Sequence, residues 1–352
     1  MVRRVIVDGH LDLAWAALAT GRDLTRPLDE VRAASPEAAG AMVTLPALGD
    51  AGVALVFATI YVEPADSWLP ADDVTAGRYA TPEEAEALAL AQLDVYREWE
   101  RGGHARIVTG RASLEAHLER FAGDRVPGLL LLMEGADPIV EVADLDAWWA
   151  RGVRMIGLAW GATRYAGGTG SDAGLTPAGA ELLGAMAARG VIHDASHLSE
   201  EAFAEAAELP HHALCLTHGA ARALMEGDGG RPSRIPLNRF SSDEQLAAVG
   251  AAGGVVGLAL LDDFLVPGGG TVTVAEHAGA HLARFAAAAG GWERVGIGSD
   301  VNPGDERDQT PAELDSVADW HRLAEPVPPD AQAGVLGGNW LRFLRTALPA
   351  EG

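Results

Sequence analysis

Short apolar runs alternate along the chain with longer stretches of helical periodicity. Eight runs have the length and composition of buried strands, at residues 3–10, 53–61, 128–135, 154–160, 190–197, 212–219, 254–261 and 294–300. Continuous apolar runs of this kind are typical of parallel strands that are covered on both faces. A further short run at 105–109 would raise the strand count to nine.

The intervening stretches begin and end with helix signals. Residues 81–102 open with Thr81 as a candidate N-cap and Pro82 at the first helical position, acidic residues follow, and the pattern stops at two glycines. These are the residues that favour a helix start and a helix end. The same arrangement recurs at 176–190, 199–209, 241–253 and 273–290.

Eight strands with intervening helices predict an α/β fold, namely a (β/α)8 TIM barrel. An open, doubly wound sheet is the alternative. A chain of 352 residues is long for one core, yet barrels of this length commonly form one domain, so we expect a single domain over 1–352.

Composition and charge exclude several classes of protein. Hydrophobic residues make up 48% and charged residues 22%, as in a globular protein with a large core. The formal charge of -24 predicts no binding to nucleic acid or to an anionic membrane. The N-terminus lacks a signal-peptide pattern and no segment reaches the roughly 20 apolar residues of a membrane helix, so we expect a cytoplasmic protein unless a leader has been removed. The single Cys215 excludes an internal disulfide.

Every basic residue is arginine, because the sequence contains no lysine. A Schiff-base lysine, a phosphate-loop lysine and a lysine-derived metal ligand are therefore all excluded.

Polar side chains gather at the carboxyl ends of the predicted strands. In a barrel these ends converge on one mouth, so residues far apart in the sequence become neighbours. The candidates are His10 and Asp12 in "VDGHLDLAW", Glu134 after "LLLLM", His197 in "VIHDASH", His218 in "LCLTHG" and Asp300 in "GIGSD".

These residue types suit a metal site. His10 and Asp12 lie two apart on an extended segment, so they project to the same side and can hold one ion together. Three histidines and two carboxylates suit zinc or a similar divalent metal, and their number suits two ions bridged by Glu134. Taken alone, each histidine is more often a hydrogen-bonded residue at a strand end than a ligand; the full set favours the metal site.

Other histidines give weaker signals. His193 and Asp194 alternate in direction, so one faces the barrel and the other the helices; Asp194 could support a ligand or simply pack. His277 and His281 are four apart on a predicted helix without a third ligand, which favours a solvated or capping pair.

These motifs resemble the membrane dipeptidase (renal dipeptidase) family, peptidase family M19, within the amidohydrolase-like metal-dependent hydrolases. The resemblance extends from "VDGHLDLAW" through "MEGADPI", "DASHLS" and "LTHGAARAL" to "GIGSD" and "GNWLRFL", nearly the whole chain. It implies two Zn²⁺ per chain, or another divalent metal, and hydrolysis of dipeptides through a metal-bridging hydroxide. Members are often dimers, so a homodimer is compatible with it.

The resemblance also implies a role for each motif residue. His10 and Asp12 look like ligands of one zinc, His197 and His218 like ligands of the other, and Glu134 like the bridging carboxylate. Asp300 is similar to the acidic residue that handles the proton of the attacking water and meets the substrate amino group. Arg239 in "LNRFSSDE" matches the arginine that holds the substrate carboxylate.

The sequence departs from the family pattern around the substrate. Trp160 in "GLAWGAT" stands where the family has a histidine that contacts the oxygen of the tetrahedral intermediate, and Leu261 stands where relatives often have tyrosine. These changes leave two alternatives open: a related binuclear hydrolase of another small amide, ester or lactone, and a non-catalytic homologue that binds metal and ligand.

Overall fold

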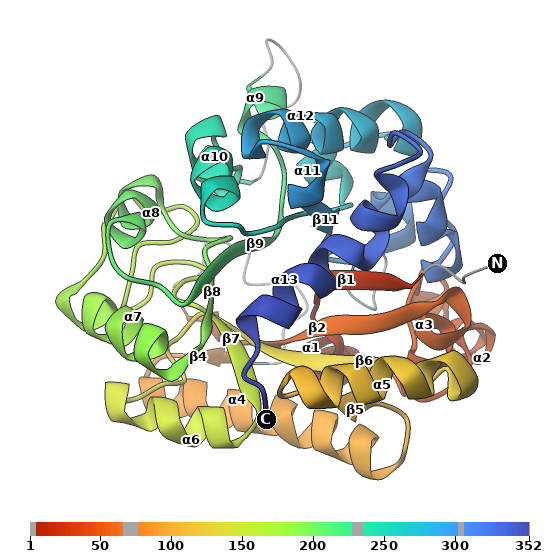
Figure 1. Ribbon diagram of the computed structural model, residues 1–352. Helices are drawn as coiled ribbons and strands as arrows, with labels where there is room; N and C mark the ends of the chain where they lie inside the picture. The colour runs from red at the N-terminus through yellow and green to blue at the C-terminus, as the bar shows by residue number, and fades with distance from the viewer. Residues whose placement is uncertain (1–4, 66–76, 227–234, 302–305, 352) are drawn as a thin grey trace.

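Eight parallel strands close into a barrel in this computed structural model, which describes residues 5–65, 77–226, 235–301 and 306–351. The barrel closes because β2 pairs with β6 along seven residues, from Leu55 opposite Gly128 to Tyr61 opposite Glu134. This pairing confirms the predicted (β/α)8 barrel and excludes the open sheet (Figure 1). The barrel strands are β1 Ile6–Leu11, β2 Val53–Tyr61, β6 Gly128–Glu134, β7 Val153–Gly157, β8 Ile192–Asp194, β9 Ala213–Gly219, β10 Val256–Leu258 and β11 Val295–Ile297.

The additional run at 105–109 forms a strand without changing the barrel. β5, Arg106–Ile107, pairs with the first two residues of β6, before the pairing of β6 with β7 begins at Leu131. The barrel therefore keeps eight strands. A separate two-stranded sheet joins β3, Glu63–Pro64, to β4, Arg78–Tyr79.

Helices surround the barrel, and each of the five stretches predicted to be helical contains one. Thr81 accepts a hydrogen bond from the backbone of Glu84, and the Glu84 carboxylate accepts bonds from Ala80 N and Thr81 N in return, which completes a capping box. The helices are α1 Leu13–Thr20, α2 Leu28–Ala34, α3 Leu45–Ala51, α4 Pro82–Arg101, α5 Arg111–Asp124, α6 Leu145–Ala150, α7 Pro177–Arg189, α8 Glu200–Ala207, α9 Arg222–Met225, α10 Asp243–Ala251, α11 Asp262–Leu265, α12 Gly279–Ala289 and α13 Asn339–Ala347. Short 3-10 or π segments lie at Pro36–Ala38, Val142–Asp144, Leu237–Arg239, Val274–Ala278, Trp292–Arg294, Glu306–Gln309, Val317–Ala324 and Gly334–Gly338. Over the described ranges, no helix is both long and apolar enough to span a lipid bilayer.

The core has two layers, as alternation along buried strands requires. One side of each strand packs against the surrounding helices, and the other side fills the barrel. The C-terminal helix α13 crosses the barrel in Figure 1 and contributes Trp340, which is fully buried and lies 4.8 Å from the Phe57 ring between centroids. The Trp340 indole donates to the Ile297 carbonyl over 2.9 Å. Part of the motif "GNWLRFL" is thus a plug of the barrel core.

The two histidines of the predicted capping pair behave differently. His277 accepts a hydrogen bond from the Thr273 backbone N–H over 3.1 Å, so it caps the helix as expected. The expectation of a solvated residue is wrong for His281, which is 1% exposed. His281 Nδ1 accepts from the Ala221 N–H at 3.0 Å, and its Nε2 lies 3.2 Å from the Leu265 carbonyl.

His281 makes stability depend on pH. Burial lowers the pKa of His281 from 6.5 to about 4, and nearby His277 adds to the effect. The neutral ring is therefore favoured in the folded state, and its contribution, complete above pH 6.5, is lost as pH falls toward 4. We expect His281→Gln, which can accept and donate at similar positions, to reduce the loss of unfolding free energy between pH 7.5 and 4.5 by about 2.5 kcal/mol.

Urea unfolding of the two proteins at both pH values measures this difference. Other ionisable groups affect both proteins alike. The exposed His321→Gln is the matched control for loss of an imidazole elsewhere on the chain. Equal pH dependence in His281→Gln and the wild type would contradict the assignment.

Candidate metal centre

The six polar residues predicted to converge lie together at the carboxyl ends of the strands. Glu134 is the last residue of β6 and His218 lies near the end of β9, while Asp12, His197 and Asp300 follow β1, β8 and β11. His10 is the next-to-last residue of β1. All six side chains are mostly buried, and they form three overlapping groups of potential ligand atoms within 4.8 Å of one another.

Glu134 separates two of these groups. Its Oε2 lies 3.5 Å from His10 Nε2, which is also 3.7 Å from Asp12 Oδ1. Its Oε1 lies 2.9 Å from His197 Nε2 and 3.5 Å from His218 Nε2. One carboxylate therefore presents one oxygen to each group.

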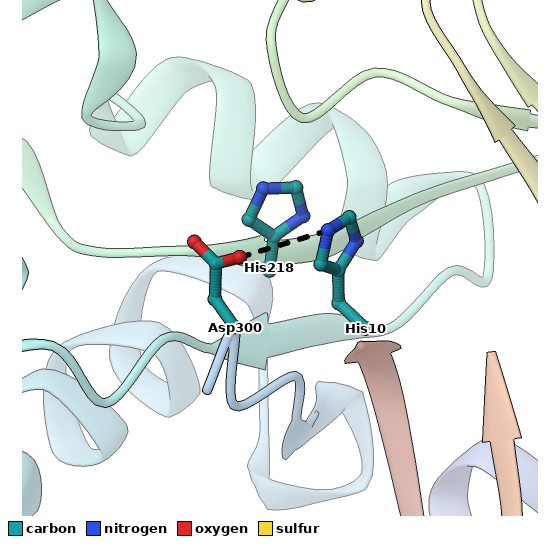
Figure 2. A group of neighbouring side chains, drawn as sticks. All are labelled: His10, His218 and Asp300. Atoms are coloured by element: carbon teal, nitrogen blue, oxygen red, sulfur yellow. Dashed lines mark ion pairs between the residues drawn. The ribbon is translucent and has the colours of Figure 1, made fainter. Parts of the chain in front are cut away.

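Asp300 lies at the edge of the same cluster. Figure 2 shows its carboxylate directed toward His10, with His218 beside both. Asp300 Oδ1 is 3.7 Å from His10 Nε2, and the His10 and His218 rings lie with centroids 3.6 Å apart and planes tilted by 33°. The Asp300 side chain is 14% exposed, against 4% for Glu134 and 9% for Asp12. Of these three carboxylates it is the most accessible to solvent.

The residues fit divalent cations. His10 Nε2 is buried without a hydrogen-bond partner among the described residues, although carboxylate oxygens surround it. Two ligand atoms that are each about 2.1 Å from one ion are separated by roughly 3–3.5 Å, close to the distances in both groups. Imidazole nitrogens and carboxylate oxygens are the ligands that zinc and similar metals take.

The electrostatics of the cluster also favour cations. Burial raises the pKa of Glu134 to about 8 and that of Asp300 to about 7, because a carboxylate loses hydration there. Burial likewise holds the pKa values of His197 and His218 well below the usual range, so both rings are neutral. Neutral imidazoles are the form that binds metal, and a cation would restore the ionised carboxylates.

Local structure at the end of β1 sets the position of His10. The Asp8 carboxylate accepts bonds from the backbone N–H of His10 at 3.0 Å and of Ser299 at 2.8 Å, and from the Ser299 hydroxyl at 2.5 Å. Gly9 leaves no room for a side chain, since a Cβ there would be 2.8 Å from the Thr217 carbonyl oxygen and 2.9 Å from the Trp340 ring. Through its hydrogen bonds to His10 and Ser299, the Asp8 carboxylate joins the end of β1 to the segment that follows β11.

The contacts between the end of β1 and the segment after β11 also determine the backbone conformation of Asp300. Its N–H donates to the His10 carbonyl at 3.2 Å, and its φ of 57° is in the left-handed region, which is uncommon for a residue with a side chain. Such a conformation is retained only where surrounding contacts impose it.

Arg239 lies against the backbone segments that carry His197 and His218. The residue is 2% exposed, and its guanidinium donates to the carbonyls of Ser196 at 3.1 Å and His218 at 3.4 Å. Burial lowers its pKa, while Asp300, Glu134 and Asp194 oppose that shift. The Phe264 ring packs against it at 5.0 Å. In this position Arg239 braces the two backbone segments that present His197 and His218.

The residues that depart from the family pattern occupy different places. Trp160 is adjacent to the cluster, with its ring centroid 6.0 Å from His197 and 5.2 Å from Tyr61. Tyr61 in turn is 5.8 Å from Trp15, so three aromatic rings form a wall beside the site. Leu261 instead packs in a small apolar cluster with Phe240 and Phe264.

Sequence reasoning missed several residues that contact the candidate ligands. Thr59 donates to Asp12, Thr169 lies 2.9 Å from His197 Nδ1, and Thr217 lies 3.0 Å from His218 Nδ1. Of the pair His193 and Asp194, Asp194 is the one that hydrogen-bonds toward the site, through Thr217. For Thr217 the sequence did contain a signal: it is a polar residue in the apolar run "LCLTHG", directly before the candidate ligand His218.

The closed parallel barrel and its buried cluster of histidines and carboxylates define a metal-dependent hydrolase. The family model described as membrane dipeptidase, peptidase family M19, matches residues 1–350. The chain therefore belongs to the membrane dipeptidase family, a family of metallopeptidases.

Individual relatives agree with this membership. The uncharacterised protein in the pqqA 5′ region of Klebsiella pneumoniae is 32% identical over 254 residues, which cover 65% of this chain and 86% of that protein. An uncharacterised dipeptidase of Schizosaccharomyces pombe is 28% identical, and the match covers 64% of this chain and 55% of that protein.

Two solved structures share the fold. The dipeptidase AC, a metallopeptidase of family M19, has a TM-score of 0.77 at 24% identity and covers 98% of both chains. A metallopeptidase from Rhodobacter sphaeroides, with a phosphinate mimic of the dipeptide L-Ala-D-Ala, has a TM-score of 0.76 at 24% identity and covers 97% of this chain and 99% of that one.

Proposed function

We propose that this protein is a zinc-dependent dipeptidase that hydrolyses the amide bond of small dipeptides. The observation that supports this best is the position of Glu134, whose two carboxylate oxygens face two separate groups of ligand atoms. A carboxylate in this position can be shared between two metal ions, so it suits a site for two of them.

Within this proposal each group would hold one Zn²⁺. His10 and Asp12 would be ligands of one ion and His197 and His218 of the other, and Glu134 would be shared between them. Bound zinc ions lower the pKa of water and polarise a carbonyl oxygen, which is the chemistry that amide hydrolysis needs. Buried surroundings make each of these charges more effective than it would be in water.

Asp300 is proposed to move the proton. Its carboxylate is near the cluster yet more accessible than Glu134 or Asp12, so water and a substrate amine can both reach it. It would accept the proton of the attacking water and deliver it to the leaving amine.

Arg239 is proposed to hold the substrate carboxylate. It is a buried cation near the ligand-bearing segments, and a planar guanidinium suits a carboxylate. Trp160 would contact the substrate from the aromatic wall, where its indole N–H can donate one hydrogen bond but carries no charge. The dipeptide mimic bound by the Rhodobacter sphaeroides neighbour supports a dipeptide with a C-terminal D-residue as the first substrate to test.

Metal removal tests the proposed activity directly. We expect purified protein to release alanine from L-Ala-D-Ala, to lose this activity to the uncatalysed level after treatment with a chelator, and to regain it when zinc is added. Protein treated with chelator that is already saturated with zinc is the control and should stay active. Absence of amino-acid release from a broad dipeptide panel, with about two zinc ions bound per chain, would contradict the dipeptidase proposal.

A second candidate is hydrolysis of another small amide, ester or lactone on the same metals. The wall of Trp15, Tyr61 and Trp160 favours it, because aromatic rings bind apolar groups and supply no positive charge. The same panel, extended to N-acyl amino acids and lactones, distinguishes the two. Faster turnover of these compounds than of dipeptides would favour the second candidate.

A further inference from the structure

A buried hydrogen-bond network joins β8 and β9 below the candidate ligands. Asp194 Oδ1 accepts from the backbone N–H of Ser196 at 3.1 Å and of Thr217 at 3.0 Å, and from the Ser196 hydroxyl at 2.5 Å. Asp194 Oδ2 accepts from the Thr217 hydroxyl at 2.6 Å. Asp194, Ser196 and Thr217 are all buried, so water does not compete for these bonds.

The network reaches a candidate metal ligand through Thr217. Its Oγ1 lies 3.0 Å from His218 Nδ1, on the side of the ring opposite the Nε2 that faces Glu134 and His197. The same oxygen is 3.5 Å from His10 Nδ1. One hydroxyl therefore contacts the distal nitrogens of two candidate ligands.

The donors and acceptors in this network have one consistent arrangement. An ionised carboxylate only accepts, so the single Thr217 hydroxyl proton is directed to Asp194. Thr217 Oγ1 is then an acceptor toward His218, and His218 Nδ1 must be the nitrogen that carries the proton. Nε2 is left with its lone pair toward Glu134 and His197, as a metal ligand requires.

We propose that Asp194 and Thr217 are positioning residues that select the metal-binding tautomer of His218. This inference rests on the proposed zinc site and adds to it two residues that bind neither metal nor substrate. It also accounts for a buried carboxylate below the site that the proposed reaction does not use. Fixing a ligand in its binding tautomer raises metal affinity, because no free energy is spent on reordering the ring when the metal binds.

Two substitutions of Thr217 separate hydrogen bonding from packing. Thr217→Val has nearly the same shape but no hydroxyl, whereas Thr217→Ser keeps the hydroxyl. We expect Thr217→Val to raise the zinc dissociation constant of the weaker site about 10–100-fold, and Thr217→Ser to change it less than about threefold. Competition with a chromophoric chelator measures both.

Asp194→Asn tests the direction of the network. Three donors face the Oδ1 position, so the asparagine oxygen is retained there and its NH₂ takes the Oδ2 position facing Thr217. That NH₂ would donate to Thr217 Oγ1, which frees the hydroxyl proton to turn toward His218 Nδ1. We expect the proton of the His218 ring to move to Nε2, and zinc affinity to fall at least as much as in Thr217→Val.

The tautomer is read in the metal-free protein by ¹⁵N-edited NMR of labelled histidine, with His218→Gln used to assign the signal. This readout is independent of zinc binding and of hydrolysis. If the wild type shows the Nδ1–H form of His218 but binds no zinc, the proposed function fails and the network stands. Thermal unfolding of each variant confirms that it is folded.

Thr310→Val is the matched control, since this buried hydroxyl bonds to the Arg307 carbonyl and to Met42 Sδ, away from the cluster. It should leave both zinc affinity and the His218 signal unchanged. Wild-type zinc affinity in Thr217→Val, an equal loss in Thr217→Ser, or an unchanged tautomer in Asp194→Asn would each overturn the proposal.

Discussion

Glu134→Gln is expected to bind less than one zinc per chain and to lose hydrolysis by more than about a thousandfold. Glutamine keeps the size of the side chain but has one oxygen and no charge. Glu134 faces His10 with Oε2, and His197 and His218 with Oε1, so the substitution weakens both proposed ions at once. Elemental analysis of the purified variant and its kcat measure the two effects.

Two further variants sharpen the result. His197→Ala removes a ligand from one group only, so it is expected to retain about one zinc per chain. Glu98→Gln, on the exposed surface of α4, is the matched control and should bind zinc and turn over like the wild type. Glu134→Gln with full zinc content would refute the bridging role.

Asp300→Asn is expected to lower kcat by about a hundredfold to ten-thousandfold while zinc content stays at the wild-type level. An amide cannot accept the proton that the proposed reaction releases, but it preserves the shape of the side chain. The backbone bond from Asp300 to the His10 carbonyl does not involve the side chain, so the loop should keep its conformation.

Zinc content distinguishes two roles for Asp300. Its Oδ1 is 3.7 Å from His10 Nε2, a distance that also permits a ligand of the first ion. If zinc and activity were lost together in Asp300→Asn, the carboxylate would be a ligand and its assignment to proton transfer would be wrong. The exposed Asp308→Asn is the control for a lost carboxylate elsewhere on the chain.

Local signals in the sequence were sufficient for the eight barrel strands, for five of the helices and for the candidate ligands. The N-caps at Thr81, Thr176 and Ser242 each act within one helical turn, so the residues around them determine where the helix begins. A charged or imidazole side chain at the end of an apolar run, as at Glu134, is costly to bury without a partner. Such residues stand out in a sequence before any contact is known.

Tertiary structure decided what these residues touch. The pairing of β2 with β6 closes the barrel, and the register of β8 with β9 then determines that Asp194 contacts Thr217 while His193 lies on the other side of β8. Alternation along a strand gives two opposite faces but does not say which one is inside. The bracing contacts of Arg239 and the plug formed by Trp340 depend on segments that are distant in sequence.

The sequence by itself determined that eight strands and five of the surrounding helices form, and which side chains could bind metal, because these depend on local propensity and on the cost of burying polar groups. Only the tertiary structure decided that Glu134 presents one oxygen to each histidine group and that Asp194 reaches His218 through Thr217. Hydrogen bonds and ion pairs form only when the two atoms are positioned to within a few tenths of an ångström, and closure of the barrel sets the distances between strands.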